Sequence, residues 1–424
     1  MKIIAFVNLR KTSGLFTASI ASLMALSIQP AFAIAFKFEK LVDNQTTMPG
    51  DGRGFTGFDQ ASISGSSVVF RGTVGRSGDP SYREGIYLLR DRALSKIVDL
   101  NTKSPSPGFS FSGFTSPILS GNVVAFLAVN PERSISLYRQ VPDKPLQIVA
   151  DPYTRPANNN PYFWRFGATR KSPQPAPIHM DGNVLVFEGG TYGAVNGQVR
   201  SLAYAQSGLP TISPRVSANR IVSVAGKQQI RLTVSNGITP ETGLSRVIAA
   251  HGMRLPDGSH LKDFGKLRGA LEPVPVISSR VILFYAQTDR ESGGLYTHTD
   301  TRQGGRLEQV LTLGETLPQL GPIKQVSSLA VSGVNLGFGV RSDNVLTAIG
   351  MRVGGQRLKV VHIGDAIEGK RVVSIAPLGT QFLSGRTMVM ILRFADGMQG
   401  IYRSTAIPET PEEAMEMEKG QERE

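Results

Sequence analysis

A short pattern that recurs seven times between residues 63 and 390 constrains the fold of this chain more than any other feature. It consists of an apolar residue, a small residue, a glycine and two loop-like residues, followed by an apolar strand that ends in Phe in most copies. The copies are 63–70, 119–126, 180–187, 277–284, 331–338 and 383–390, with a degraded copy at 216–224. Glycine between two apolar runs is typical of a tight turn, because it tolerates a positive φ. Each copy therefore predicts a hairpin leading into a buried strand, and the serine before the glycine is attributed to the turn.

Two further strands follow most copies of the pattern. One ends in an aromatic residue, as in Gly85-Ile86-Tyr87, and the other resembles Lys96-Ile97-Val98-Asp99. The turn positions are Gly65, Gly121, Gly182, Asn219, Ser279, Gly333 and Gly385, separated by 56, 61, 37, 60, 54 and 52 residues. Short β-branched strands at these steps, divided by Gly and Pro, predict either the blades of a β-propeller or the coils of a β-solenoid.

The two ends of the repeat region distinguish these folds. The last copy ends at Gly400-Ile401-Tyr402 without a Lys-Ile-Val-Asp strand, whereas Lys40-Leu41-Val42-Asp43 supplies such a strand before the first copy. In a ring, the N-terminal strand completes the last sheet and leaves no unpaired edge at the seam. We therefore expect an all-β fold, a β-propeller closed by an N-terminal strand. The seven copies favour seven blades, and the short step from Gly182 to Asn219 leaves six as the alternative.

The N-terminus has the three parts of a secretory signal. A basic start without acidic residues precedes an uncharged run at 15–28, and Ala31-Phe32-Ala33 supplies the small residues at which a signal peptidase cleaves. The uncharged run is shorter than the roughly 20 residues that span a bilayer. We therefore expect cleavage near Ala33 and a secreted, periplasmic or cell-surface protein. No later run is long and apolar enough to span a bilayer, so no transmembrane segment is expected in the mature chain.

The chain is expected to consist of a signal peptide at 1–33, a β-propeller-like repeat domain at 34–406 and an acidic disordered tail at 407–424. The formal net charge is +13; the signal carries +3 and residues 409–424 carry −5, so the body carries +15. This balance favours an anionic polysaccharide or a protein as partner, and a solvated basic surface without a partner is the alternative. No nucleic-acid partner is expected, because no dense run of Lys and Arg interleaved with aromatic residues occurs.

The sequence contains no recognisable catalytic motif. It has no Gly-x-Ser-x-Gly elbow, no phosphate-binding loop, no closely spaced histidines and no cysteine, so disulfides and thiolate chemistry are excluded. No cofactor is expected, with calcium as the alternative. Asp43, Asp99 and Asp151 end strands and are candidate calcium ligands if they face a shared channel. Asx turns at the strand ends account for all three without a metal.

Tyr162, Trp164 and Arg165 are candidate ligand-binding residues. They lie in the run Tyr-Phe-Trp-Arg-Phe at 162–166, which contains the only tryptophan of the chain. Exposed aromatic rings beside a cation form a face on which a sugar stacks. Aromatic residues also occur at the equivalent places in the first two repeats, at 55–58 and 109–114, and this equivalence favours packing within a sheet.

The Ser-Gly turn, the strand ending in Phe and the Gly-Ile-Tyr strand resemble the repeats of a poorly characterised propeller-like family of exported bacterial proteins, cyanobacterial ones among them. The resemblance covers nearly all of residues 36–404. It implies the fold and carries over no functional residue. Some members end in a Pro-Glu-Pro sorting segment with a membrane helix, and Ile407-Pro408-Glu409-Thr410-Pro411 has no such helix after it.

Three functional hypotheses follow, and the positive body together with the missing catalytic motifs ranks them. The first is a non-enzymatic binding or scaffold protein that recognises an anionic or carbohydrate ligand. The second is a propeller hydrolase or lyase that acts on sugars or esters through carboxylates, and the third is a structural protein of the cell envelope. The fold alone does not separate binding from catalysis, because propellers support both.

Overall fold

The computed structural model describes residues 34–408, apart from 106–109, 132–133, 152–153, 155–177, 183, 188–191, 196–197, 202–210, 226–227, 235–243, 256, 265–274, 291, 302–303 and 344. The expected signal peptide and residues 409–424 of the expected tail lie outside this part. Residues Lys37–Thr405 form one compact unit, and the arrangement given below is that of this unit. Every regular element described is a β-strand, and no helix in the described part has the length and apolarity needed to cross a membrane.

The described strands form seven antiparallel sheets of at least four strands, which we number as blades 1–7 in chain order from β2. Blade 1 consists of β2 (Gly57–Ser64), β3 (Ser67–Val74), β4 (Arg83–Arg90) and β5 (Ala93–Asp99). Blade 2 consists of β6 (Gly113–Ser120), β7 (Val123–Val129), β8 (Ile135–Gln140) and β9 (Gln147–Ala150). Blade 3 consists of β10 (Ile178–Asp181), β11 (Val184–Phe187), β12 (Tyr192–Val195) and β13 (Gln198–Ser201). Blades 4 and 5 consist of β14 (Thr211–Ser217), β15 (Arg220–Ala225), β16 (Gln229–Val234) and β17 (Leu244–Ala250); β18 (Leu261–Asp263), β19 (Val276–Ser278), β20 (Val281–Thr288), β21 (Gly293–Thr301) and β22 (Gly304–Thr312).

Blade 6 consists of β25 (Gln325–Ser332), β26 (Asn335–Ser342), β27 (Val345–Val353) and β28 (Gln356–His362). Blade 7 consists of β29 (Ala366–Ile367), β30 (Lys370–Ile375), β31 (Leu383–Ser384), β32 (Thr387–Phe394), β33 (Gln399–Pro408) and β1 (Ile34–Asp43). A two-stranded sheet of β23 (Thr316–Leu317) and β24 (Gly321–Pro322) lies between blades 5 and 6 in the sequence.

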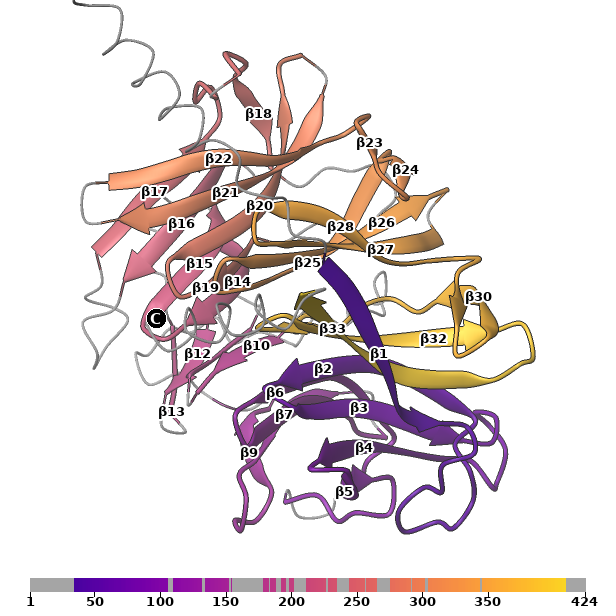
Figure 1. Ribbon diagram of the computed structural model, residues 1–424. Coiled ribbons are helices and arrows are strands. Elements are labelled where there is room, and N and C mark those ends of the chain that lie inside the picture. The colour runs from indigo at the N-terminus through magenta and orange to yellow at the C-terminus, as the bar shows by residue number, and fades with distance from the viewer. Residues whose placement is uncertain are drawn as a thin grey trace, which may run out of the picture. The chain divides into compact units, whose positions relative to one another are not determined.

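The blades follow one another around a common axis in chain order (Figure 1). One strand of each blade is innermost, and the contacts between the innermost strands form a closed series: β2–β6, β6–β10, β10–β14, β14–β19, β19–β25, β25–β31 and β31–β2. The expected β-propeller is therefore confirmed, and the number of sheets agrees with the seven blades that the seven copies of the pattern favour. The short step before Asn219 has a simple cause, because blade 3 keeps four strands but each is only four residues long.

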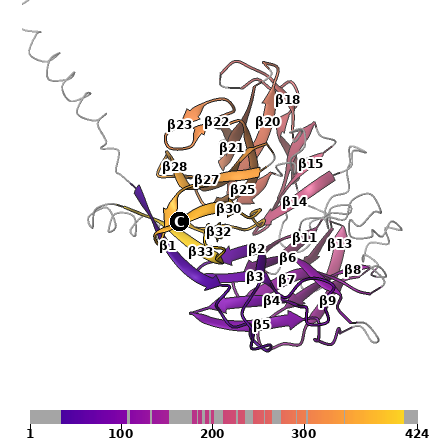
Figure 2. The same cartoon turned by 90° about the vertical axis from the view of Figure 1, so that its right-hand side faces the viewer.

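The N-terminal strand closes the ring as expected. β1 pairs with β33 and becomes the outermost strand of blade 7, whose other strands come from the C-terminal end of the repeat region (Figure 2). The last blade is therefore built from both ends of the described chain, and β33 has a partner on each side. This agrees with the prediction made from Lys40-Leu41-Val42-Asp43.

The two recurring aromatic positions meet inside the blades. The recurring Phe lies within its strand, which continues for three or four residues beyond it. It lies opposite the Tyr of the next strand, with ring centroids 5.8 Å apart for Phe70 and Tyr87, 5.7 Å for Phe126 and Tyr138, and 5.9 Å for Phe284 and Tyr296. All three pairs are stacked and buried. Cross-strand aromatic pairs stabilise a sheet, so the repeat pattern places the same pair in each of these blades.

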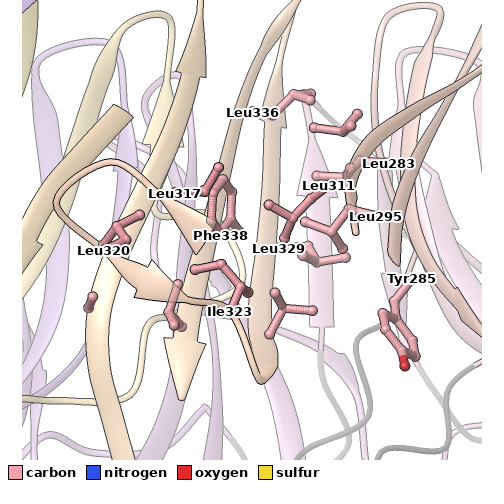
Figure 3. Close-up of a cluster of buried hydrophobic side chains, with 14 of the residues drawn as sticks. Leu283, Tyr285, Leu295, Leu311, Leu317, Leu320, Ile323, Leu329, Leu336 and Phe338 are labelled. Carbon is pink, nitrogen blue, oxygen red and sulfur yellow. The ribbon is translucent and has the colours of Figure 1, made fainter. Parts of the chain in front are cut away.

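Apolar side chains from adjacent blades fill the space between the sheets. Figure 3 shows the cluster between blades 5 and 6, where Leu283, Leu295 and Leu311 face Leu329, Leu336 and Phe338, and Leu317, Leu320 and Ile323 come from the connection that carries β23 and β24. Similar clusters join blades 1 and 2, 2 and 3, and 4 and 5. The blades are therefore held mainly by burial of apolar surface, as a chain without cysteine requires.

Candidate functional site

A cavity of about 150 Å³ lies where the innermost strands of all seven blades end. Each of these strands contributes its last two or three residues to the lining, an apolar residue followed by a polar one in every blade. The cavity is thus built from the part of the repeat that immediately precedes each turn. This position makes it the one described site to which every blade contributes.

The polar residues at the strand ends form a closed ring of hydrogen bonds, which we call the collar. The collar consists of Ser64, Ser120, Asp181, Ser217, Ser278, Ser332 and Ser384. Their side-chain oxygens accept the backbone N–H of Gly121 (2.9 Å), Gly182 (2.8 Å), Ala218 (2.6 Å), Ser279 (2.8 Å), Gly333 (3.0 Å), Gly385 (2.7 Å) and Gly65 (2.9 Å), respectively. Each blade therefore binds the turn of the next blade, and blade 7 binds blade 1.

The turn residues that donate to the collar share one backbone conformation. Their φ angles lie between 51° and 58°, and five of the seven residues are glycine. This left-handed conformation is the one that glycine adopts without strain. The serine before each glycine was attributed to the turn itself, but its oxygen accepts from the neighbouring blade. The recurrence of serine therefore reflects contacts between repeats, which a pattern within one repeat does not reveal.

The collar leaves hydrogen-bond donors at the cavity. A serine hydroxyl that accepts an N–H keeps its own proton to donate. Among the described residues, none accepts a hydrogen bond from a collar serine. Six hydroxyl groups around the cavity therefore have a donor available to a bound molecule or to water.

Replacing Ser384 by alanine is expected to lower the free energy of unfolding by about 1 kcal/mol, because the Gly65 N–H loses its acceptor at the seam of the ring. Urea unfolding followed by circular dichroism measures the loss. Ser66 is the matched control, since it is exposed in the turn of blade 1 and does not belong to the collar. Equal stabilities of S384A and S66A would contradict a stabilising collar.

A segment of blade 7 forms part of the cavity wall. β30 and β31 both pair with β32, and residues 376–382 between them, the crossing segment, leave the sheet. Gly379 of this segment packs against Ala61 of blade 1, and a Cβ on Gly379 would lie 2.3 Å from the Ala61 carbonyl oxygen. Only glycine permits so close an approach of two backbones. The crossing segment is therefore fitted against blade 1.

The crossing segment also reaches blade 3, which is not adjacent to blade 7 in the ring. Thr380 Oγ1 donates to the carbonyl oxygen of Ile178 at 3.4 Å, and Gln381 Nε2 donates to that of Met180 at 2.9 Å. The backbone carbonyl of Gln381 accepts the N–H of Ile63 in blade 1 at 2.8 Å. Both Thr380 and Gln381 line the cavity.

The amide of Gln381 has a defined orientation and an unpaired acceptor. Its nitrogen must face the Met180 carbonyl, because two carbonyl oxygens would repel each other, and this fixes the position of Oε1. Gln381 Oε1 is buried without a hydrogen-bond partner in the described part of the protein. Buried acceptors are rarely left unpaired in folded proteins. Gln381, which lines the cavity, therefore has an acceptor for which the described residues supply no partner.

His179 and Asp181 make blade 3 chemically different from the other blades at the cavity. His179 is buried, and its Nδ1 accepts the backbone N–H of Val216 at 3.4 Å. Burial and, to a lesser degree, the charge of Arg215 hold the pKa of His179 well below its ordinary value, so the ring is neutral at neutral pH. Asp181 is then the only charged side chain among the described residues of the lining.

The three candidate calcium ligands lie at equivalent positions on the outermost strands. Asp43 and Asp99 end β1 and β5, and Asp151 follows β9. Each carboxylate accepts a hydrogen bond from the threonine hydroxyl three residues later, at 3.0, 2.7 and 2.7 Å. The structure therefore places them in turns on three separate blades and does not bring them to the cavity. No group of three metal-ligating side chains suited to an ion occurs among the residues that the structure describes.

Tyr162, Trp164 and Arg165 lie outside the described residues. Of their expected equivalents, residues 55–58 and 110–114 are described, and Phe55 and Phe111 among them pack against the tyrosines of the blades. Phe55 contacts Tyr87 edge to face at 5.2 Å, and Phe111 contacts Tyr138 in the same way at 5.2 Å. In blades 1 and 2 these aromatic residues therefore belong to the core.

An ionic network with one buried member, Glu84, joins blades 1 and 2. Arg71 on β3 binds Asp59 on β2 and Glu84 on β4, with N–O distances of 2.9 Å in both pairs. Glu84 also accepts the Tyr82 hydroxyl at 2.6 Å and the backbone N–H of Phe114 in blade 2 at 2.7 Å. Burial raises the pKa of Asp59 even though Arg71 opposes this shift. Asp59 is thus part of an inter-blade connection.

Comparisons with known proteins bear on the fold. No protein-family model matches the sequence, and no curated protein matches it either. The β-propeller domain of the Trilobed protease from Pyrococcus furiosus is similar over 84% of this chain and 100% of that chain, with 10% identity and a TM-score of 0.47. The WD40 domain of coronin from Toxoplasma gondii is similar over 90% and 88%, with 8% identity and a TM-score of 0.43.

A puromycin-hydrolysing peptidase from Mycobacterium tuberculosis is similar over 84% of this chain and 51% of that chain, with 12% identity and a TM-score of 0.43. The chain thus spans about half the length of this peptidase. At such identities the likeness concerns the fold, and no activity is carried over from it.

Proposed function

We propose that this chain is an exported β-propeller that binds a small hydroxylated ligand, a carbohydrate of about monosaccharide size, in the cavity at the collar. The observation that carries the proposal is the ring of six serine hydroxyls with available donors, beside the unpaired acceptor Gln381 Oε1. A sugar presents hydroxyl groups that both donate and accept. Export stays an expectation from the signal sequence and forms part of the proposal.

The size and composition of the cavity support this ligand class. Its volume of about 150 Å³ is roughly ten times the ~10–15 Å³ that one ordered water requires, which corresponds to a ligand of about ten non-hydrogen atoms. Every collar residue follows an apolar residue that also lines the cavity, such as Ile63 before Ser64 and Leu119 before Ser120. Alternating hydroxyl and apolar groups suit a sugar, whose hydroxyls lie around apolar C–H faces.

The chemistry of the lining favours binding over catalysis. Each serine oxygen of the collar already accepts a backbone N–H, and the Nδ1 of His179 accepts from Val216. No serine is thus paired with a base in the described lining, as nucleophilic catalysis requires. The lining contains a single carboxylate, whereas glycoside hydrolysis ordinarily uses two. An anionic polymer would find no cation here and would bind the basic exterior of the body instead.

Neutral monosaccharides such as D-glucose and D-galactose are expected to bind purified residues 34–424 with an affinity that salt does not change. Saturation-transfer-difference NMR at two ionic strengths measures this. Gln381→Met removes the amide and is expected to weaken binding about tenfold, the effect of losing one to two hydrogen bonds. S66A is the control that should bind as the unchanged protein does.

Two results would overturn the proposal. One is the absence of binding by any neutral sugar in the panel. The other is binding confined to polyanions, fading with salt and unchanged in Q381M, which would place the ligand on the basic exterior. Thermal unfolding of Q381M, with Thr380→Val as a second variant, verifies that loss of binding is not loss of the fold.

A further inference from the structure

Asp181 occupies the collar position of blade 3, where the other six blades have serine. Six collar positions are serine, and blade 3 alone has a carboxylate. Asp181 Oδ2 makes the same bond as the serines, accepting the N–H of Ala218 at 2.6 Å. A serine would serve this structural role, as it does in the other blades. The collar hydrogen bond therefore requires neither the negative charge nor the second oxygen of Asp181.

The charge of Asp181 has no ion-pair partner within the described part of the chain. No lysine or arginine lines the cavity, and the neutral His179 supplies no positive charge. Arg215, whose charge acts on His179, is buried on β14 but does not belong to the lining. Asp181 is partly exposed and thus open to a ligand in the cavity. The cavity therefore has a negative charge that a bound cation would compensate.

A second acceptor belongs to a residue that is bonded to the neighbour of Asp181 in the chain. Gln381 Nε2 donates to the carbonyl of Met180, the residue before Asp181, so the amide of Gln381 is held beside blade 3. Its oxygen is the buried acceptor without a partner. A protonated primary amine has three donors and no acceptor. It matches a carboxylate and an amide oxygen better than a neutral hydroxyl does.

We infer that the cavity prefers a hydroxylated ligand with a protonated primary amine, that is, an amino sugar, whose ammonium group binds at Asp181 and Gln381. The inference rests on the proposed function, since the serine hydroxyls bind the remaining hydroxyl groups. An N-acetylated or acidic sugar lacks the positive charge and gains nothing from Asp181. The expected preference is about tenfold, since hydrogen bonds between charged groups are stronger than neutral ones.

The test compares D-glucosamine, D-glucose and N-acetyl-D-glucosamine at pH 6, where the amine is protonated, by titration calorimetry of residues 34–424. D-Glucosamine is expected to bind about tenfold more tightly than the other two. Asp181→Ser, which installs the residue of the other six blades, is expected to abolish this preference, so that D-glucosamine binds no more tightly than D-glucose. Thermal unfolding of D181S checks that the collar is intact, and Asp181→Asn removes the charge with even less change in shape.

The outcomes separate this inference from the proposed function. Equal binding of D-glucosamine and D-glucose would overturn the amine preference and leave the carbohydrate site standing. A preference that persists in both D181S and D181N would also overturn it, because the charge would then lie elsewhere. Failure of all three sugars to bind would overturn the proposed function and the inference together.

Discussion

Replacing Phe126 by alanine is expected to lower the free energy of unfolding by about 3–5 kcal/mol, as for other buried phenylalanines. Phe126 is fully buried in the middle of β7. Its ring stacks on Tyr138 at 5.7 Å and meets the edge of Phe114 at 5.9 Å. It belongs to the apolar cluster between blades 1 and 2, so its loss leaves a cavity at a blade interface.

Urea unfolding of residues 34–424 measures this loss. Val334→Ala is the control, because Val334 is 61% exposed in the turn between β25 and β26 and its truncation is expected to change stability by less than about 0.5 kcal/mol. Phe126→Leu, which keeps most of the apolar volume, should lie between the two. A loss below about 1 kcal/mol for F126A would show that the Phe–Tyr pair does not hold the blades.

Replacing Arg71 by alanine is expected to cost about 3 kcal/mol at pH 7, because it leaves two carboxylates at a blade interface without their cation. Glu84 is nearly inaccessible, with 5% of its side chain exposed, and Asp59 lies on the other side of Arg71. Burial already raises the pKa of Asp59, and the Arg71 charge is what opposes this shift. Without Arg71 the pKa of Asp59 rises further.

The sign of the pH dependence follows from this shift. A carboxyl whose pKa is higher in the folded than in the unfolded state favours folding at low pH, and this contribution is lost as the pH rises through the folded pKa. The difference in stability between the unchanged protein and R71A is therefore expected to shrink from pH 7 to pH 4.5. Chemical unfolding at both pH values measures it.

Arg352→Ala is the matched control for the Arg71 variant. Arg352 binds Glu308 at 2.7 Å, and the Glu308 side chain is 41% exposed, as is that of Asp59, whereas the Glu84 side chain is 5% exposed. A pair as exposed as Arg352 and Glu308 is worth roughly 0–1 kcal/mol. A cost for R71A no greater than that for R352A, at either pH, would contradict a stabilising role for the network.

Much of the fold could be predicted from the sequence, because the signals lie close together in the chain. The turn positions at Gly65, Gly121 and Gly182 have the left-handed φ that the pattern predicted. The strand that contains the recurring Phe and the strand that contains the recurring Tyr are adjacent in the sheet, so both patterns belong to one hairpin. The closing strand at Lys40-Leu41-Val42-Asp43 could be predicted only by counting strands in the whole repeat region, since its partner lies at the other end.

The candidate site could not be predicted in the same way. The carboxylates chosen as calcium ligands, Asp43, Asp99 and Asp151, shared a place in the repeat and therefore shared a local turn. The residues that line the cavity include the six serines of the recurring turn. Repetition indicates a structural role within each repeat. In a closed ring it also brings seven equivalent groups together around one axis.

By itself the sequence determined the hairpins, the aromatic pairs and the closure of the ring, because tight turns and alternating strands depend on residues a few positions apart. Only the tertiary structure decided which backbone N–H groups the collar residues bind and where the crossing segment lies. Ser384 meets Gly65 across 319 residues, and Gln381 meets Met180 across 201. Such contacts exist only once all the blades are in place, and no local pattern specifies the partner of a hydrogen bond that spans the ring.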